Sequence, residues 1–210
     1  MNRKAMKTSD VSRYNRIALG INAPIYAYYA ARILEKTGIG SGSCLDVGCG
    51  GGYLGLALAR ITALDFIFLD LSQDMLRCAD ENISAYGLTG RAVTQLGQVQ
   101  AIPLSDASVD LVISRGSVPF WDELSTAFRE INRVLKPGGH AYVGGGLGDP
   151  KTRDAIRGQM EKEDPEWLEN RRTLPRHDNR HYSDALEAAG IDSYTLDRGD
   201  DGMWIVFRKE

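Results

Sequence analysis

Two aspartates and a group of glycines are the residues whose types and spacing indicate chemistry in this sequence. Asp46 lies in a short apolar run and is followed by four glycines within the five residues 48–52. Glycine adopts positive φ angles and leaves no Cβ between the main chain and a ligand. The apolar, alanine-rich run that follows predicts a helix whose first turn presents unpaired N–H groups. We expect a strand, a glycine turn and a helix that hold a ligand against the backbone.

The glycines allow two registers for this turn. The segment Gly50–Gly55 matches the G-x-G-x-x-G spacing of dinucleotide sites. A loop that starts there would leave Asp46 inside a parallel sheet, where an unpaired charge is costly. A loop that starts at Gly48 puts Asp46 at the carboxyl end of the strand, where α/β sheets bind ligands. We favour this second register, in which Gly48, Gly50 and Gly52 are the loop glycines.

The second carboxylate, Asp70, ends the next predicted strand, 65–70. It follows the glycine loop by about 20 residues, the place where dinucleotide enzymes carry an acid that binds a ribose. A carboxylate there can accept hydrogen bonds from both ribose hydroxyls. Asp70 therefore indicates a nucleoside without specifying which one. Leu71 and Met75 follow and could flank an adenine ring, and Ser72 is predicted to cap a helix.

Outside this region the hydrophobic pattern predicts alternating strands and helices. The expected strands are 44–47, 65–70, 92–96, 109–114, 140–143, 194–196 and 203–207. The expected helices are 11–36 with a break or start at Pro24, the run after the glycine loop, 73–85, 123–135, 154–168 and 183–189. Such an alternation is typical of an α/β domain built on a parallel sheet.

In the register that starts at Gly48, the loop resembles that of the class I S-adenosylmethionine-dependent methyltransferases, whose pattern is an acidic residue followed by G-x-G-x-G. The resemblance extends from about Gly42 to Gly146 and is strongest at this loop, at 68–72 and at 133–139. It implies an α/β, Rossmann-like sheet of seven mostly parallel strands with an antiparallel last strand and helices on both faces. It also implies one methyltransferase domain over residues 1–210. The expected parts are a helical cap (1–40), a cofactor-binding core (41–146), a variable substrate-side segment (147–180), and a helix with a terminal hairpin (181–210).

The resemblance implies S-adenosylmethionine as the cofactor. The residues that it assigns to the cofactor are Asp46, Gly48, Cys49, Gly50, Gly52, Asp70, Leu71, Met75, Gly97, Gln98, Val99, Ser114 and Arg115. Similar enzymes usually carry an acid at the position of Gln98, which must instead accept the adenine amino group through its amide oxygen. Ser114 and Arg115 are candidates for the methionine end of the cofactor. Arg115 could pair with the cofactor carboxylate or with an acidic substrate, and the alternative is a structural salt bridge.

The residues at the end of the fourth predicted strand restrict the acceptor class. Enzymes of this family that methylate amino groups of nucleic acids or glutamine carry Asn or Asp followed by Pro-Pro-Tyr or a close variant, whereas this chain has Ser-Arg-Gly-Ser at 114–117. The aspartate of the magnesium-dependent catechol-type enzymes does not fit at Ser114, and no proline-cysteine pair is present. We therefore expect in-line methyl transfer to a small molecule in a closed pocket.

Two groups of side chains could act on that acceptor. The arginines Arg171, Arg172, Arg176 and Arg180 would suit an anionic substrate, but a solvated face or loop is the favoured explanation. If a proton must be removed, Tyr14, His177 and His181 are the candidate catalytic residues. A metal site at the two histidines is disfavoured, so we expect no metal.

The composition limits the partners. The chain has 210 residues and a formal net charge of −3, which offers no attraction to nucleic acid. No apolar run approaches the ~20 residues of a membrane span. The three cysteines, Cys44, Cys49 and Cys78, fit reduced core thiols and a cytoplasmic protein. We expect a monomer or homodimer with a small-molecule substrate.

Two alternative functions fit the same motifs. A non-catalytic S-adenosylmethionine-binding protein would retain the loop and Asp70. An NAD-dependent oxidoreductase would use the same strand, loop and carboxylate, but the length leaves little room for its second nucleotide-binding half or substrate domain.

Overall fold

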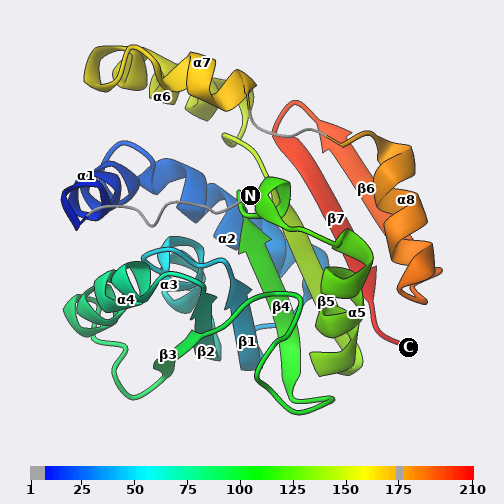
Figure 1. The fold of residues 1–210 in the computed structure, drawn as a ribbon. Coiled ribbons are helices and arrows are strands. Elements are labelled where there is room, and N and C mark those ends of the chain that lie inside the picture. Colours follow the sequence, from blue (N-terminus) through cyan, green and yellow to red (C-terminus); the bar gives the residue numbers. More distant parts are fainter. Residues whose placement is uncertain (1–7, 174–176) are drawn as a thin grey trace.

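One seven-stranded sheet organises the chain in the computed structural model, which describes residues 8–173 and 177–210 (Figure 1). Its strand order is β3-β2-β1-β4-β5-β7-β6. The strands are β1 (Ser41–Val47), β2 (Ala63–Asp70), β3 (Ala92–Leu96), β4 (Val109–Arg115), β5 (Leu135–Gly145), β6 (Tyr194–Gly199) and β7 (Gly202–Arg208). Strands β1 to β5 are parallel, and β7 is antiparallel to both neighbours. The predicted Rossmann-like fold is confirmed.

Helices cover both faces of the sheet (Figure 1). They are α1 (Thr8–Leu19), α2 (Ala23–Thr37), α3 (Tyr53–Ala59), α4 (Gln73–Ala85), α5 (Leu124–Val134), α6 (Pro150–Glu163), α7 (Trp167–Arg172) and α8 (Asn179–Ala188), with the 3-10 turn η1 (Val118–Phe120). One core cluster contains residues of α1, α2, α3, α4 and α6. A second cluster contains residues of α5 and α8. The apolar stripes of helices in these two clusters therefore cover the two faces of the sheet.

The register brings the predicted polar residues to one edge of the sheet. Asp46 in β1 pairs with Phe68 of β2 on one side and with Ile113 of β4 on the other. The carboxyl ends of these three parallel strands therefore lie together, with Asp70 and Arg115 at the ends of β2 and β4. Between β1 and β4 the strand order changes direction, which is where open α/β sheets bind ligands.

Helix α2 is attached to the terminal hairpin by a polar network. The Tyr29 hydroxyl donates to the Asp201 carbonyl and accepts from the Gly148 N–H at 3.0 Å. Arg32 forms ion pairs with Asp197 at 2.9 Å and with Asp201 at 3.1 Å. Because α2 is a predicted cap element and Gly148 follows β5, this network fixes the cap relative to the carboxyl edge of the sheet.

Several element boundaries differ from the sequence prediction: β1 begins at Ser41, β6 ends at Gly199 and α8 begins at Asn179. Two further differences have a local cause. A single helix over 154–168 is wrong, since α6 ends at Glu163 and α7 begins at Trp167. Pro165 accounts for the break, because the residue before a proline is driven out of the helical region, and Asp164 has φ −151° and ψ 90°. Of the predicted basic cluster, Arg171 and Arg172 fall in α7, and Arg176 lies outside the described residues.

Strand β5 also begins earlier than the predicted 140–143. It starts at Leu135, directly after α5, and its pairing with β4 shifts register between Val109 and Leu111. Gly139 permits this, because a Cβ there would lie 2.9 Å from the Asp110 carbonyl oxygen. Within the described chain, no helix has the length and apolar character needed to cross a membrane.

Candidate functional site

The glycine loop between β1 and α3 has the register predicted from Asp46. Strand β1 ends at Val47, and Gly48, Gly50 and Gly52 have φ angles of 64°, 55° and 83°. These left-handed conformations are strained for residues with a Cβ. At Gly48 a Cβ would also lie 2.5 Å from the Ser117 Cβ. Glycine is therefore required at the first loop position by both backbone angle and space.

Two strand-end aspartates hold the loop through its backbone. The Gly50 N–H donates to Asp70 Oδ2 at 2.8 Å, and the Gly55 N–H donates to Asp46 Oδ2 at 3.0 Å. The other Asp70 oxygen accepts from the Ser72 N–H at 2.9 Å. Each carboxylate thus connects its own strand to the loop or to the first turn of α3, and both keep lone pairs for a ligand.

Asp46 is buried, with 2% of its surface exposed. Burial raises the pKa of Asp46 to about 7, the charge of Asp70 adds to this rise, and the hydrogen bond from Gly55 opposes it. Burial likewise raises the pKa of Asp70, against hydrogen bonds from the backbone of Ser72, Gly50 and Leu71. Two neighbouring carboxylates with raised pKa values form a site that favours a cationic ligand.

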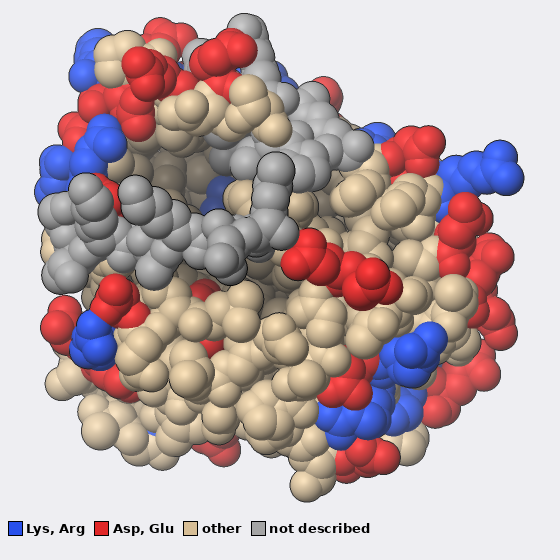
Figure 2. Space-filling view, viewed as in Figure 1, with Lys and Arg blue, Asp and Glu red and all other residues tan. Residues whose placement is uncertain are grey.

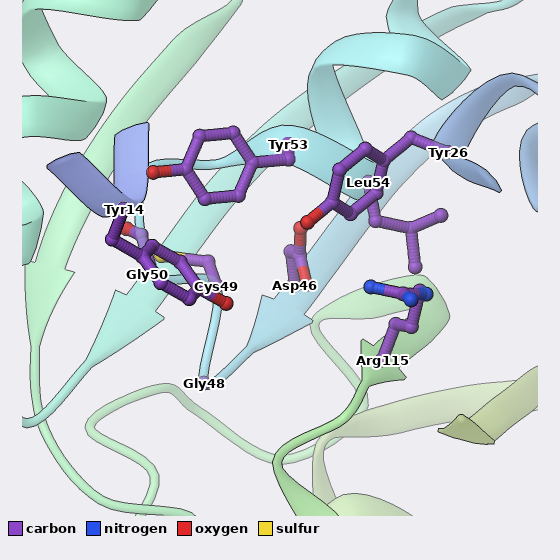
Figure 3. Close-up of a pocket in the computed structure, with 9 residues that line it drawn as sticks. All are labelled: Tyr14, Tyr26, Asp46, Gly48, Cys49, Gly50, Tyr53, Leu54 and Arg115. Atoms are coloured by element: carbon purple, nitrogen blue, oxygen red, sulfur yellow. The ribbon is translucent and has the colours of Figure 1, made fainter. Parts of the chain in front are cut away.

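A cavity lies over the loop at this edge of the sheet (Figure 3). Its lining residues are Tyr14, Tyr26, Asp46, Gly48, Cys49, Gly50, Tyr53, Leu54 and Arg115. The three tyrosines come from α1, α2 and α3, with the rings of Tyr14 and Tyr26 at 5.9 and 5.5 Å from that of Tyr53. Burial raises the pKa of Tyr26 and of Tyr53, so both phenols stay protonated. The cavity therefore has an aromatic roof and a polar floor.

Arg115 closes one side of this cavity. Its guanidinium carbon lies 4.9 Å from the centre of the Tyr26 ring, and Nη2 donates to the Gly146 carbonyl at 2.7 Å. Its Nε is buried and has no hydrogen-bond partner within the described chain. Among the residues that the structure describes, no Asp or Glu carboxylate lies within ion-pair distance of the Arg115 guanidinium. A guanidinium left partly unsatisfied in a cavity is suited to bind an anion.

The structure brings six of the predicted site residues to this cavity: Asp46, Gly48, Cys49, Gly50, Arg115 and Tyr14. Gly52 lies at the N-cap of α3, and Asp70 contacts the loop from β2. Ser114 is fully buried, and its hydroxyl lies 2.5 Å from that of Ser117, which donates to the Val47 carbonyl. Ser114 therefore connects β4, through Ser117, to the end of β1 and does not line the cavity.

The predicted adenine contacts lie near Asp70. Leu71 directly follows Asp70 and is 65% exposed, whereas Met75 is buried against Val11 and Cys78 between α1 and α4. The Gly97 N–H donates to the Asp70 carbonyl at 3.1 Å, which places 97–99 beside the end of β2. In that segment Gln98 is exposed and Val99 is buried in the core.

His177 and His181 are not among the residues that line the cavity. Their rings stack on each other with centres 4.1 Å apart, and the His177 ring contacts that of Tyr182 at 5.7 Å. Tyr182 belongs to the core cluster of α5 and α8, on the other face of the sheet from α1, α2 and α3. Burial lowers the pKa of His177, and the neighbouring His181 adds to this effect. Their catalytic role stays a prediction.

The sequence does not single out three of the lining residues: Tyr26, Tyr53 and Leu54. Tyr53 and Leu54 directly follow the last loop glycine, so their position in the motif was the available signal. Tyr26 is one of four tyrosines at positions 14, 26, 28 and 29, any of which could cover the site, and only the packing of α2 against α3 brings it over the loop. Within residues 8–173 and 177–210, no group of three or more His, Cys, Asp or Glu side chains is arranged to hold a metal ion.

Comparison with known proteins identifies the class. Residues 45–143 match the family described as "Methyltransferase domain". A solved protein from Methanococcus maripaludis, named provisionally as an S-adenosyl-L-methionine-dependent methyltransferase, has a TM-score of 0.91 and 38% identity, covering 100% of this chain and 96% of that chain. The chain belongs to the class I S-adenosylmethionine-dependent methyltransferases, and the prediction from the glycine loop is confirmed. S-adenosylmethionine is the cofactor of this family.

Curated relatives are similar over part of their length. The malonyl-(acyl-carrier protein) O-methyltransferase of Methylovorus sp. (strain MP688) is 33% identical over 160 residues, which are 73% of this chain and 51% of that protein. Phosphoethanolamine N-methyltransferase 1 of Arabidopsis thaliana is 28% identical over 206 residues, which are 97% of this chain and 40% of that protein. This chain therefore spans about half, or less, of the length of these relatives.

The raised pKa of Asp46 predicts a pH-dependent stability. Its pKa of about 7 in the fold lies above the ~3.9 of an unfolded carboxyl, so the fold loses stability as pH rises from about 4 to about 7. Asp46→Asn removes this loss and keeps an acceptor for the Gly55 N–H. Its free energy of unfolding should exceed that of the wild type by roughly 1–4 kcal/mol at pH 8 and by much less at pH 4. Urea unfolding across this pH range measures the difference.

The matched control is Asp65→Asn, an exposed position of β2. Its pH profile should run parallel to that of the wild type. A profile of Asp46→Asn that is also parallel to the wild type would show that Asp46 ionises normally in the fold.

Proposed function

We propose that this protein transfers the methyl group of S-adenosylmethionine to a small-molecule acceptor by in-line displacement. The observation that carries the proposal is the cavity over Gly48–Gly50, which is roofed by Tyr14, Tyr26 and Tyr53. Such an enclosed space favours a small acceptor. The names of two relatives support this, because they give phosphoethanolamine and squalene as the acceptors.

The residues at the cavity fit the cofactor. Asp70 keeps lone pairs at the end of β2 for a ribose, beside the loop that it holds. Buried Asp46 suits the ammonium group of a methionine, and the unpartnered Nε of Arg115 suits a carboxylate. We assign Gly48, Cys49, Gly50 and Gly52 to the backbone contacts, and Leu71, Met75, Gly97, Gln98, Val99 and Ser114 to the surroundings of adenine and methionine.

The bound cofactor supplies a reactive sulfonium methyl group, so the chain need not create an electrophile. Its residues have to orient the acceptor and exclude water. Orientation of this kind is worth ~7–11 kcal/mol in favourable cases. Tyr26 and Tyr53 contribute walls rather than bases, since burial raises the pKa of both. Tyr14 is the predicted proton acceptor that lines the cavity, and His177 and His181 are predicted proton acceptors outside its lining.

The acceptor is proposed to be anionic. Arg115 is the basic residue that lines the cavity, and its Nε is buried without a partner in the described chain. A carboxylate would satisfy it, whether that carboxylate belongs to the cofactor or to the acceptor. The segment 147–180 is proposed to complete the substrate side. Figure 2 shows this face of the molecule hollowed beneath α6 and α7.

The free cysteines and the surface charge support proposals for the cellular setting and the partners. Cys44, Cys49 and Cys78 are free and buried, which fits a reducing cytoplasm. On the face seen in Figure 2, Lys and Arg side chains of the described residues are interspersed with Asp and Glu, which supports a partner other than nucleic acid. We propose a monomer or homodimer that acts as one methyltransferase domain.

The direct test is methyl transfer from methyl-labelled S-adenosylmethionine to small-molecule fractions, followed by mass spectrometry of the labelled product. Transfer to a low-molecular-weight acid is the expected result. Label that never leaves the bound cofactor in any fraction would favour a non-catalytic cofactor-binding protein. Label recovered only on protein or nucleic acid would contradict a small acceptor.

Asp70→Ala should weaken S-adenosylhomocysteine by roughly 1.5–3 kcal/mol, the range for hydrogen bonds to a charged group. Isothermal titration calorimetry measures this. Asp65→Ala, on the exposed side of the same strand, is the control and should bind as the wild type does. Equal affinities of Asp70→Ala and wild type would remove the ribose assignment.

The variant Arg115→Gln distinguishes whether Arg115 binds the carboxylate of the cofactor or that of the acceptor. If Arg115 binds the cofactor, the variant should bind S-adenosylhomocysteine about 10-fold or more weakly and its decarboxylated analogue as the wild type does. If Arg115 binds the acceptor, affinity for S-adenosylhomocysteine should stay unchanged while the acceptor KM rises. Unchanged values in both assays would leave Arg115 a structural residue and contradict the anion-binding role.

A further inference from the structure

Asn82 is a buried polar residue of α4, only 4% exposed, that faces the cofactor loop. Its Nδ2 donates to the Gly51 carbonyl oxygen at 2.9 Å and to Asn15 Oδ1 at 3.0 Å. Asn15 Nδ2 lies 3.5 Å from Asn82 Oδ1, which makes the two amides a reciprocal pair. A buried amide on an otherwise apolar helix face requires partners of this kind.

The hydrogen bonds fix which way the Asn82 amide points. An NH2 group has two hydrogens, and here one goes to Gly51 and the other to Asn15. The reversed amide would put Oδ1 against the Gly51 carbonyl oxygen, and two acceptors would face each other in a buried, low-dielectric environment. The network therefore requires a donor at position 82 and discriminates against an oxygen there.

The Gly51 carbonyl lies at the centre of the loop. Gly51 stands between Gly50 and Gly52, which both have positive φ angles. With its carbonyl held by Asn82, the Gly51–Gly52 peptide is oriented so that the Gly52 N–H donates to the Cys49 carbonyl at 2.9 Å. Glycines lose the most backbone freedom on ordering, so a bond that orders them beforehand reduces the cost of binding a ligand.

The partner of Asn82 connects the loop to α1. Asn15 follows Tyr14, which lines the cavity and would lie 4.0 Å from a Cβ on Gly50. Helix α1 also contacts α4 through Val11, which is buried with Met75 and Cys78. The Asn15–Asn82 pair therefore links α1, which contributes Tyr14 to the cavity, to the backbone of the glycine loop.

We propose that Asn82 is a positioning residue for the cofactor. It holds the loop through the Gly51 carbonyl and, through Asn15, couples the loop to α1, so that the residence time of the cofactor depends on the Asn15–Asn82 pair. The inference rests on the proposed function, because it needs a cofactor at the loop. It assigns Asn82 no contact with the reacting atoms.

Asn82→Asp and Asn15→Ala test the proposal, with S-adenosylhomocysteine as the probe. Asn82→Asp replaces the donor by an oxygen of the same shape and should weaken binding by about 10-fold or more. Asn15→Ala leaves the Gly51 bond intact and should raise the dissociation rate by about 3- to 10-fold. Calorimetry gives the affinity and stopped-flow displacement gives the rate. Asn170→Asp, the same change at an exposed position of α7, is the control and should match the wild type.

Thermal unfolding of the ligand-free variants separates positioning from a purely structural role. A lowered midpoint with affinity and dissociation rate within twofold of the wild type would overturn the proposal. If Asn82→Asp fails to fold, the dissociation rate of Asn15→Ala decides. Failure of the wild-type chain to bind the probe would overturn the proposed function and this inference with it, whereas tight wild-type binding with unchanged variants would overturn the inference alone.

Discussion

The site depends on two carboxylates that end adjacent parallel strands and accept backbone N–H groups beyond them. Asp46 holds the first turn of α3 through Gly55, and Asp70 holds the loop through Gly50. Both are removed from water, and their pKa values are raised in consequence. Two carboxyl groups therefore lie close together and away from water, and a cationic ligand would stabilise their charged forms. The left-handed glycines and the close packing of α3 on β2 follow from bringing the loop to these carboxylates.

The roof over this floor is built from elements far apart in the sequence. Helix α1 brings Tyr14, α2 brings Tyr26, and the terminal hairpin fixes α2 through the Tyr29 and Arg32 network. Arg115, at the end of β4, stacks on Tyr26 and bonds to the chain after β5. Closing such a cavity strengthens every electrostatic interaction inside it by excluding water. The terminal hairpin therefore supports the site without entering it.

Local rules accounted for the parts of the site that are contiguous in the chain. The loop register followed from the cost of placing Asp46 deep in the sheet, and Asp70 followed from its place at the end of an apolar strand. The N-cap at Ser72 was confirmed by its hydrogen bond from the Met75 N–H at 3.3 Å. The break between α6 and α7 follows from Pro165, which is itself a local signal, whereas the early start of β5 depends on a close approach of two strands at Gly139.

The sequence by itself determined the fold class, the loop, its two aspartates and the family, because each of these depends on residue types at short spacing. Only the tertiary structure decided that Tyr26 and Tyr53 line the cavity, that Asn82 holds the Gly51 carbonyl, and that His177 and His181 stack beside Tyr182. The physical reason is that side-chain contacts between different helices are set by how the helices pack on the sheet. Hydrophobic periodicity fixes which face of a helix is buried but not which residues of another helix it meets.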